Sequence, residues 1–213
     1  MAAPGRAADM KRRDLLIAAT AVATGLSWAD DGAALVRELQ SRLTQPAWLH
    51  GEFEQVKEVP GFKKPLVSRG DFVVARSKGV LWRTRQPFAS ELRLTRDQVR
   101  ASQSGVTSFQ LDASREPALR TINALMFALL NGEMAGLAEL FTLQAQLQPK
   151  TWQLSLTPRQ PALQQFLQRI ELEGDAFVRR LVILETSGDR STIAFSNLRA
   201  DAAPGAGEAG LFE

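Results

Sequence analysis

Few side chains in this sequence could perform catalysis or bind a metal. His50 is the single histidine and the chain has no cysteine, which excludes disulfides, thiolate nucleophiles, thiolate metal sites and polyhistidine metal sites. The sequence contains no Gly-x-Ser-x-Gly elbow that would support a catalytic Ser–His pair. No two acidic residues stand at a recognisable catalytic spacing. We therefore expect no enzymatic activity and no cofactor. We expect His50 to be a surface residue in the turn after the first helix.

Arg76 is a charged residue whose position suggests a specific role. The alternation of residues 66–76 places Arg76 on the same strand face as Phe72 and Val74. A charge on an apolar face is costly unless it is paired, and the guanidinium offers five donors in a fixed fork. Two interpretations stay open: hydrogen bonds to a segment that covers the face, or an arginine at a strand end that reaches water.

Other basic residues lie on the opposite strand faces or in loops. We expect those on the strand faces to be solvated, with acidic partners or lipid headgroups as the alternative; they include Arg83, Arg85, Arg93 and Arg96. Lys63 and Lys64 stand in a loop beside Phe62. This loop is a candidate contact for a membrane or a partner.

The first 29 residues have the layout of an export signal. A positive segment, Met10–Arg13, precedes the apolar run Leu15–Leu26 and a small-x-small site, Ser27-Trp28-Ala29. This order is typical of a cleaved secretory signal peptide, and the run is too short for a permanent membrane span. We expect cleavage after Ala29 and a periplasmic mature chain. Either Met1 or Met10 can be the start, and Arg12-Arg13 leaves both general and twin-arginine export open.

The composition of the whole chain is that of an ordinary globular protein. Hydrophobic residues make up 45% and charged residues 23% of the 213 residues. The whole chain carries 26 basic and 23 acidic residues, and 22 basic and 21 acidic residues remain after position 29. Because no basic surface is concentrated in the sequence, we expect no nucleic-acid partner. We expect a monomer with one domain over residues 30–200 and a flexible tail over residues 201–213.

The spacing of apolar residues predicts a helix and then a series of strands. Helical spacing covers residues 33–43. Period-two alternation predicts strands over residues 51–57, 66–76, 80–84, 91–94 and 98–102. Helical stripes then cover residues 117–130 and 134–141. Strand patterns return over residues 152–156, 166–173, 177–185 and 192–198.

Strands joined by such short turns form antiparallel meanders. A meander of this length must curl, and the helices must cover one of its faces. We therefore predict an α+β fold, a half-open, unclosed antiparallel β-barrel with a helical lid over an apolar cavity.

An ordered set of motifs resembles the LolA-like outer-membrane lipoprotein carrier family. The set begins with Leu43 and continues through Phe53-Glu54-Gln55, Gly70–Arg76, Leu81-Trp82-Arg83 and Gln86-Pro87. In the second half, Trp152–Pro158, Ile170–Leu172 and Gly188–Asn197 are similar to that family's later strands. The resemblance extends from Ala33 to Leu198. The chain departs from the family at Ser77, where a proline is usual, and at Val80, where an inward aromatic is usual.

The resemblance implies a specific function. A carrier of this family binds the acyl chains of a lipoprotein in an apolar cavity and carries them from the inner to the outer membrane. It receives the cargo from an inner-membrane ABC transporter and delivers it to an outer-membrane receptor. By its spacing to Trp82, Arg76 matches the arginine that latches the lid of the empty carrier. The residues predicted to line the cavity are Phe53, Phe72, Val74, Val80, Trp82, Leu92, Leu94, Leu125, Met126, Leu129, Trp152, Leu154, Leu156, Ile170 and Leu172.

Other functions remain open at this stage. The same apolar stripes also suit an ordinary hydrophobic core. The cargo could be another lipid or a lipid-linked molecule, and a periplasmic lipid-sensing or regulatory interaction domain is known to share the fold. An outer-membrane receptor of this fold is itself a lipoprotein, and the absence of cysteine argues against that function.

Overall fold

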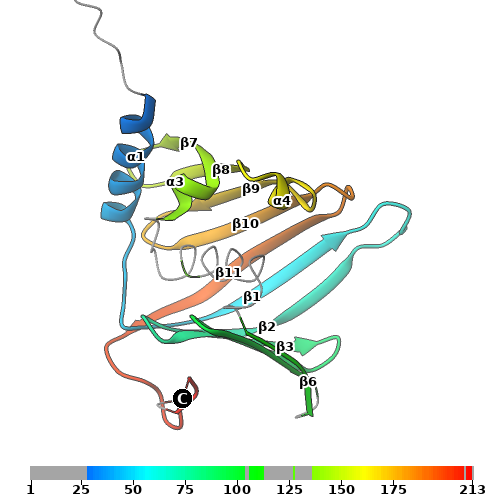
Figure 1. Cartoon of the computed structure of the whole chain (residues 1–213). Coiled ribbons are helices and arrows are strands. Elements are labelled where there is room, and N and C mark those ends of the chain that lie inside the picture. Colours follow the sequence, from blue (N-terminus) through cyan, green and yellow to red (C-terminus); the bar gives the residue numbers. More distant parts are fainter. Residues whose placement is uncertain (1–27, 104–105, 113–126, 128–135, 209, 213) are drawn as a thin grey trace, which may run out of the picture.

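The computed structural model describes residues 28–103, 106–112, 127, 136–208 and 210–212. The strands of this part of the chain form one antiparallel sheet of 11 strands, which curls so that its two edges face each other (Figure 1). The helices of this part of the chain are α1 (Trp28–Arg42), α3 (Leu137–Leu140) and α4 (Pro161–Gln164). No helix among the described residues is long and apolar enough to cross a membrane.

The strands form two meanders, one on each side of residues 113–140 in the sequence. The first six are β1 (Trp48–Glu58), β2 (Leu66–Ala75), β3 (Gly79–Gln86), β4 (Ser90–Thr95), β5 (Gln98–Gln103) and β6 (Val106–Asp112). The last five are β7 (Phe141–Leu147), β8 (Trp152–Pro158), β9 (Leu167–Gly174), β10 (Val178–Glu185) and β11 (Arg190–Asp201).

The two meanders are joined by the first and last strands. The spatial order is β6-β5-β4-β3-β2-β1-β11-β10-β9-β8-β7, so β1 pairs with β11 in the centre. Strands β6 and β7 stand at the two edges, and the sheet described here is therefore unclosed. The prediction of an unclosed antiparallel sheet is confirmed. The predicted lid falls mainly on residues 113–126 and 128–135, outside the described part of the chain.

Most predicted strands are observed with boundaries that shift by a few residues. Two strands were not predicted, and both are edge strands, β6 and β7. The helix predicted over residues 134–141 is described only as α3, and Phe141 already begins β7. Helix α1 begins at Trp28 rather than at Ala33, and the predicted signal peptide lies almost wholly outside the described residues.

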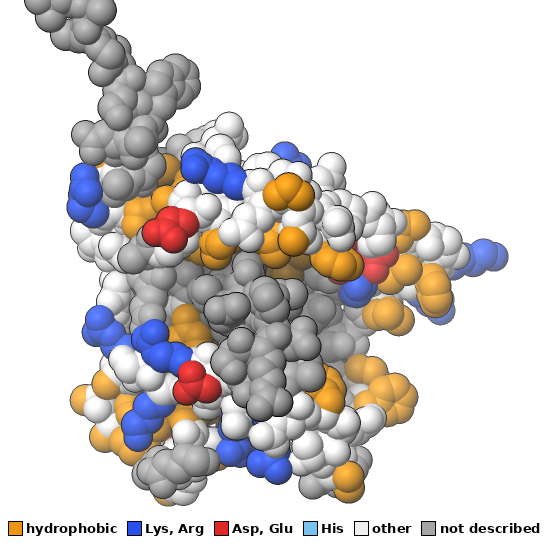
Figure 2. Space-filling view, in the orientation of Figure 1, with side chains coloured by type: hydrophobic (Ala, Val, Ile, Leu, Met, Phe, Trp, Pro, Cys, Tyr) orange, Lys and Arg blue, Asp and Glu red, His pale blue; other side chains and the backbone are white. Residues whose placement is uncertain are grey.

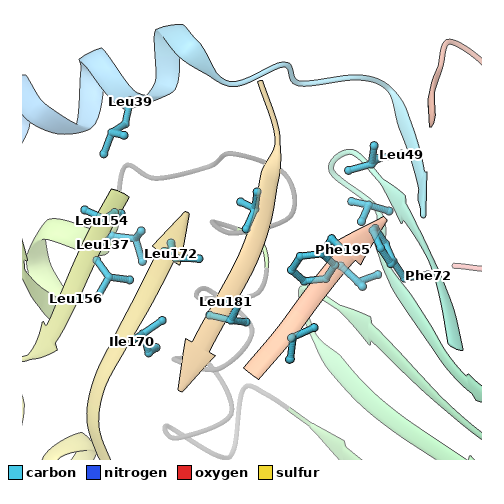
Figure 3. Close-up of a cluster of buried hydrophobic side chains, with 14 of the residues drawn as sticks. Leu39, Leu49, Phe72, Leu137, Leu154, Leu156, Ile170, Leu172, Leu181 and Phe195 are labelled. Atoms are coloured by element: carbon cyan, nitrogen blue, oxygen red, sulfur yellow. The ribbon is translucent and has the colours of Figure 1, made fainter. Parts of the chain in front are cut away.

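The main hydrophobic core lies on the concave face of the curled sheet (Figure 3). Residues of both meanders contribute to it because alternate residues of each strand point to the same face. Helices α1 and α3 add Leu39 and Leu137, which are 0% and 1% exposed. One continuous cluster therefore joins the sheet to the helices that cover it.

A smaller apolar cluster lies on the convex face. Trp48, Val73, Ala75 and Leu81 are buried there, and Leu211 and Phe212 of the C-terminal segment pack against them. The rings of Trp48 and Phe212 are 6.2 Å apart. The segment that was expected to be a flexible tail thus has defined contacts with the back of the sheet.

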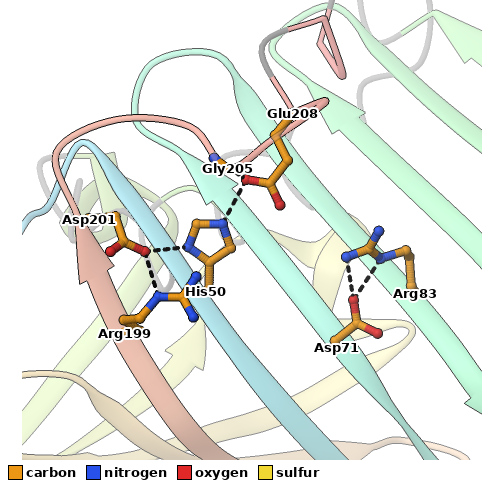
Figure 4. Close-up of polar contacts among 7 residues, drawn as sticks. All are labelled: His50, Asp71, Arg83, Arg199, Asp201, Gly205 and Glu208. Carbon is orange, nitrogen blue, oxygen red and sulfur yellow. Dashed lines mark hydrogen bonds and ion pairs between the residues drawn. The ribbon is translucent and has the colours of Figure 1, made fainter.

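His50 connects the same segment to β1 (Figure 4). Its Nε2 atom lies 2.8 Å from Glu208 Oε2, and its Nδ1 atom lies at the ion-pair distance of 2.9 Å from Asp201 Oδ2. The backbone N–H of Gly205 donates to the same Glu208 oxygen, at 2.8 Å. The expectation that His50 lies in a surface turn is wrong, because β1 begins at Trp48 and places the ring between two carboxylates.

Glu208 gives these contacts a pH dependence. Burial acts to raise the pKa of the Glu208 carboxyl, but the hydrogen bonds with His50 and Gly205 outweigh it and hold the pKa below its ordinary value of 4.5. A carboxyl with a lowered pKa in the folded state stabilises that state above its ordinary pKa. The stabilisation is lost as the pH falls through the folded-state pKa.

We predict that Glu208→Gln lowers the free energy of unfolding near neutral pH by about 1 kcal/mol. The difference should shrink as the pH falls below 4.5, where the wild-type carboxyl becomes protonated. Urea unfolding over a pH series measures this. Glu54→Gln is the control, because Glu54 pairs with Arg69 in an exposed ion pair whose loss costs little. A Glu208→Gln effect that is independent of pH would contradict the prediction.

Candidate functional site

The concave face is built from rows of apolar side chains that run across neighbouring strands. In the first meander, Phe72 lies opposite Trp82, and Trp82 lies opposite Leu92. The next row joins Val74, Val80 and Leu94 in the same way. Cross-strand neighbours on one face are in direct contact, so each row forms a continuous apolar strip.

The second meander continues the apolar surface with aliphatic residues. Leu154, Leu172 and Leu181 form one row across β8, β9 and β10. Leu156, Ile170 and Ile183 form the next row. Both halves of the concave face therefore carry aliphatic rows, and aromatic rings of both meanders belong to the same cluster.

Four aromatic rings form the centre of the face. Phe53 and Trp82 stack with their centroids 3.8 Å apart, although β2 separates their strands. Phe195 of β11 packs edge-on against Phe72 and Trp82, at 5.5 and 6.2 Å. Such pairs contribute about 1 kcal/mol beyond the area that they bury.

Gly70 explains how rings from β1 and β3 can meet across β2. Gly70 is the cross-strand partner of Phe53, and a Cβ atom at this position would collide with the Arg83 carbonyl oxygen and lie 2.8 Å from Phe53 Cε1. The missing side chain leaves the space over β2 in which Phe53 reaches Trp82. Any larger residue at position 70 would compete with the ring for this space.

Trp152 anchors the opposite part of the core. Its side chain is 1% exposed, and its indole N–H donates to the Asp175 carbonyl at 2.7 Å. The buried polar atom of this ring is thus satisfied. Gly174 leaves room for the ring, because a Cβ atom there would lie 2.5 Å from Trp152 Cζ2.

Helix α1 covers one end of the concave face, and polar contacts with described residues hold it there. Val36 and Leu39 of α1 belong to the core. Beyond the helix, the Thr44 N–H donates to the Ala176 carbonyl at 2.8 Å. Arg42 donates to the Gln148 carbonyl at 2.5 Å. These acceptors lie in the β9–β10 and β7–β8 turns, so α1 is attached to a single end of the sheet.

The described members of the predicted cavity lining all lie in this one cluster. Trp82 and Leu92 are partly buried, and the buried members are Phe53, Phe72, Val74, Val80, Leu94, Trp152, Leu154, Leu156, Ile170 and Leu172. Leu125, Met126 and Leu129 fall outside the described residues. Sequence reasoning did not select Leu39, Leu49, Leu137, Leu181 and Phe195, which belong to the same cluster. Of these, Phe195 had a visible signal, since it alternates with Ile193 along β11.

Arg76 has a different environment from the one that its spacing predicted. Strand β2 ends at Ala75, so Arg76 lies in the following turn and is exposed. Its guanidinium donates to the Gln45 side-chain oxygen at 2.7 Å and to the Gln45 carbonyl at 3.3 Å. The Arg76 N–H donates to the Ala47 carbonyl at 2.9 Å. The described contacts therefore connect Arg76 to the segment between α1 and β1.

The surface hollows of the described residues have a different character from the concave face. A hollow of about 470 Å³ lies over β7, β8 and β9 and is lined mainly by glutamine and charged side chains. Another, of about 410 Å³, is lined by Lys78, Arg93, Arg96, Arg100 and Phe212, among others. No cluster of three or more potential metal ligands occurs among the described residues. The concave face is thus the large apolar surface of the described chain.

Comparison with known proteins gives one family match. The model of a family described as "Outer membrane lipoprotein carrier protein LolA-like" matches residues 29–209. A search of curated protein sequences found no significant match.

Several solved structures are similar to the chain at low sequence identity. A LolA superfamily protein from Nitrosomonas europaea is 10% identical, with a TM-score of 0.46 over 81% of this chain and 94% of the other. An outer membrane lipoprotein-sorting protein domain from Vibrio parahaemolyticus, itself described as putative, is 9% identical, with a TM-score of 0.47 over 84% and 96%. The MucA/MucB complex of Pseudomonas aeruginosa gives 16% identity and a TM-score of 0.44 over 84% and 59%.

We predict that Phe195→Ala strongly destabilises the protein, because it removes a ring that contacts both Phe72 and Trp82. The expected loss in the free energy of unfolding is about 3 kcal/mol or more. Urea denaturation measures it. Phe166→Ala is the matched control: Phe166 is 70% exposed, and its loss should cost about 0.5 kcal/mol or less. Equal effects of the two substitutions would show that the aromatic group does not organise the core.

Proposed function

The chain belongs to the outer membrane lipoprotein carrier protein LolA-like family, and from this premise we propose that it is a periplasmic carrier. It binds the acyl chains of lipoproteins against the concave face and shuttles them from the inner to the outer membrane. An inner-membrane ABC transporter and an outer-membrane receptor would be its membrane partners. A carrier of this kind binds and releases its cargo without covalent chemistry, so no catalytic residue is assigned.

The observation that carries the proposal is the continuous apolar concave face of an unclosed sheet. Burial of an acyl chain contributes about 0.8 kcal/mol for each methylene group, so affinity requires an extended apolar surface rather than a few polar contacts. The aromatic rings and aliphatic side chains of both meanders supply such a surface. An unclosed sheet can also widen at its edges without breaking strand pairs.

In the structure, side chains of the protein itself fill the concave face. Leu39 and Leu137 are almost fully buried against the sheet, yet they belong to helices rather than to strands. We infer that the acyl chain replaces these leucines, and that the helices return to the face when the cargo leaves. The affinity for cargo is then the difference between two burial energies, which makes release feasible.

Two further parts of the proposal rest on the sequence. The export signal over residues 1–29 supports the periplasmic location. The cargo class is inferred from family membership. A different lipid or a lipid-linked molecule would use the same apolar surface. A periplasmic lipid-sensing domain would bind lipid without transferring it.

Native mass spectrometry of the mature chain, residues 30–213, tests the proposal directly. After purification from periplasm, the carrier should retain a triacylated lipoprotein and release it to acceptor membranes. If a different lipid were bound, the proposed binding surface would stand and the proposed cargo would be wrong. A lipid that binds but is never transferred would favour the sensing domain. A protein that takes up no lipid when lipid is offered would refute the carrier function.

We predict that Leu39→Ala tightens acyl-chain binding while it destabilises the empty protein. Removal of this buried leucine weakens the cover by about 2–5 kcal/mol, and a weaker cover competes less well with cargo. Titration with a fluorescent fatty acid measures the affinity. Leu81→Ala is the matched control, because Leu81 is equally buried but on the convex face. It should destabilise the fold and leave the affinity unchanged. Equal affinities of the two variants would contradict the proposal that the acyl chain displaces α1 from the concave face.

Arg76 is the proposed latch of the empty carrier. Its hydrogen bonds with Gln45 join the β2–β3 turn to the segment that follows α1, so their loss should make closure of the empty state less favourable. We predict that Arg76→Leu retains cargo and transfers it to acceptor vesicles more slowly than the wild type. Arg85→Leu is the control, because Arg85 pairs with Asp71 on the convex face. Wild-type transfer by Arg76→Leu would refute the latch.

A further inference from the structure

Exposed apolar side chains gather at one end of the sheet. Phe62, Phe88, Val106 and Phe166 are 67–74% exposed, and Leu66 is 54% exposed. Each lies in or beside a connection between two strands. Phe62, Phe88 and Phe166 lie in the β1–β2, β3–β4 and β8–β9 connections, and Leu66 and Val106 are the first residues of β2 and β6. We call these five residues the apolar rim.

The strand pairing places all four connections at the same end. In an antiparallel meander, successive connections alternate between the two ends of the sheet. The pairs Lys57↔Leu66, Thr84↔Ser90 and Gln103↔Val106 close three of the connections. In the second meander, the Thr186 N–H of the β10–β11 turn donates to the Phe166 carbonyl at 3.1 Å. Hydrophobic side chains appear along the right-hand side of the molecule in Figure 2, where the β1–β2 hairpin projects in Figure 1.

Such a gathering requires a physical reason. Single exposed apolar residues are normal on protein surfaces, but several large ones at one end mark an interaction site. The rim residues stand on the tips of separate connections and do not line a common pocket among the described hollows. A soft surface that adapts to separate tips fits this arrangement better than a rigid partner does.

The charges beside the rim favour an anionic surface. Lys63 and Lys64 follow Phe62 directly, are exposed, and form no ion pair with any described residue. Two acidic residues near this end, Glu185 and Asp189, already have a basic partner. Lys57 lies 3.0 Å from Glu185 and 2.8 Å from Asp189, and these contacts raise the pKa of its ammonium group.

The rim is also opposite to the end that α1 covers. The turns that hold α1, β7–β8 and β9–β10, lie at the other end of the meander. An acyl chain that enters the concave face past the apolar rim would therefore not need to pass the attachment of α1. The rim would bring this end of the half-barrel to the level of the lipid tails.

We propose that the apolar rim is a docking surface for an anionic lipid bilayer, with the phenylalanine rings inserted between headgroups and Lys63 and Lys64 on the lipid phosphates. The inference rests on the proposed function insofar as a carrier must meet membranes. It adds a direct lipid contact, a defined end of the molecule and named residues.

Vesicle flotation tests the docking surface. The probe is an equimolar mixture of phosphatidylethanolamine and phosphatidylglycerol, with pure phosphatidylcholine as the neutral comparison. The wild type should float with the anionic vesicles. Phe62→Ser combined with Phe88→Ser should reduce flotation about tenfold or more, since each ring would lose most of its transfer energy. Lys63→Gln combined with Lys64→Gln should abolish the preference for anionic vesicles.

The matched control is Phe109→Ser. Phe109 is 46% exposed but lies within β6 rather than at a strand end, so this variant should float like the wild type. Because the chain has no cysteine, a dye can be attached at a single introduced cysteine. This second measurement leaves the other residues of the apolar rim in place. A polarity-sensitive dye on Phe88→Cys should shift to the blue with anionic vesicles, whereas the same dye on Lys150→Cys, in the β7–β8 turn, should not.

The outcomes separate the rim from the carrier function. Uptake of a fluorescent fatty acid in the absence of vesicles reports on the concave face and should be unchanged in the rim variants. A wild type that takes up fatty acid but does not float would overturn the rim proposal and leave the carrier function intact. Flotation without fatty-acid uptake would support the rim and refute the carrier. Equal flotation of the wild type and the double phenylalanine variant would also overturn the rim.

Discussion

The unclosed sheet is the constraint on which the rest of the structure depends. A closed barrel would bury its inner face by itself, but here β6 and β7 stand at two separate edges of the described sheet. The apolar concave face must therefore be covered by elements that are not strands, and α1 and α3 contribute Leu39 and Leu137 for this purpose. A cover that is not part of the strand ladder can be exchanged without breaking backbone hydrogen bonds of the sheet.

The two faces of the sheet show how differently this constraint acts. On the convex side, a small apolar cluster is covered by Leu211 and Phe212, and the polar contacts of His50 with Asp201 and Glu208 hold the covering segment. On the concave side, large rings occupy space that glycines leave free. Directional polar contacts fix one geometry, whereas apolar packing against a smooth surface accepts a substitute of similar shape. The concave face is accordingly the side on which we place the proposed acyl cargo.

Much of this arrangement could be predicted from alternation, and the failures have physical causes. The pattern of β2, β3 and β8 identified Phe72, Trp82 and Leu154 as members of one face, because period two fixes side-chain direction. Strand β7 alternates just as clearly, but a helical stripe that overlaps Phe141 concealed it. The contacts of His50 join residues 158 positions apart, and no local pattern contains such information. Arg76 lies just beyond the strand that alternation extended to it, because β2 ends at Ala75 and the chain turns at Ser77 with a φ of 67°.

A carrier between two membranes is limited by release as much as by binding. If cargo entered an empty cavity, the full burial energy of its methylene groups would oppose departure, and each additional group would slow release further. Where cargo replaces buried leucines, the protein recovers a comparable burial energy when the cargo leaves. Affinity then depends on the shape and length of the acyl chain relative to the cover, and small changes in the cover shift the balance between loading and delivery. In the proposed exchange, the polar contacts that attach α1 to described residues, through Arg42, Thr44 and the Gln45–Arg76 pair, would have to open.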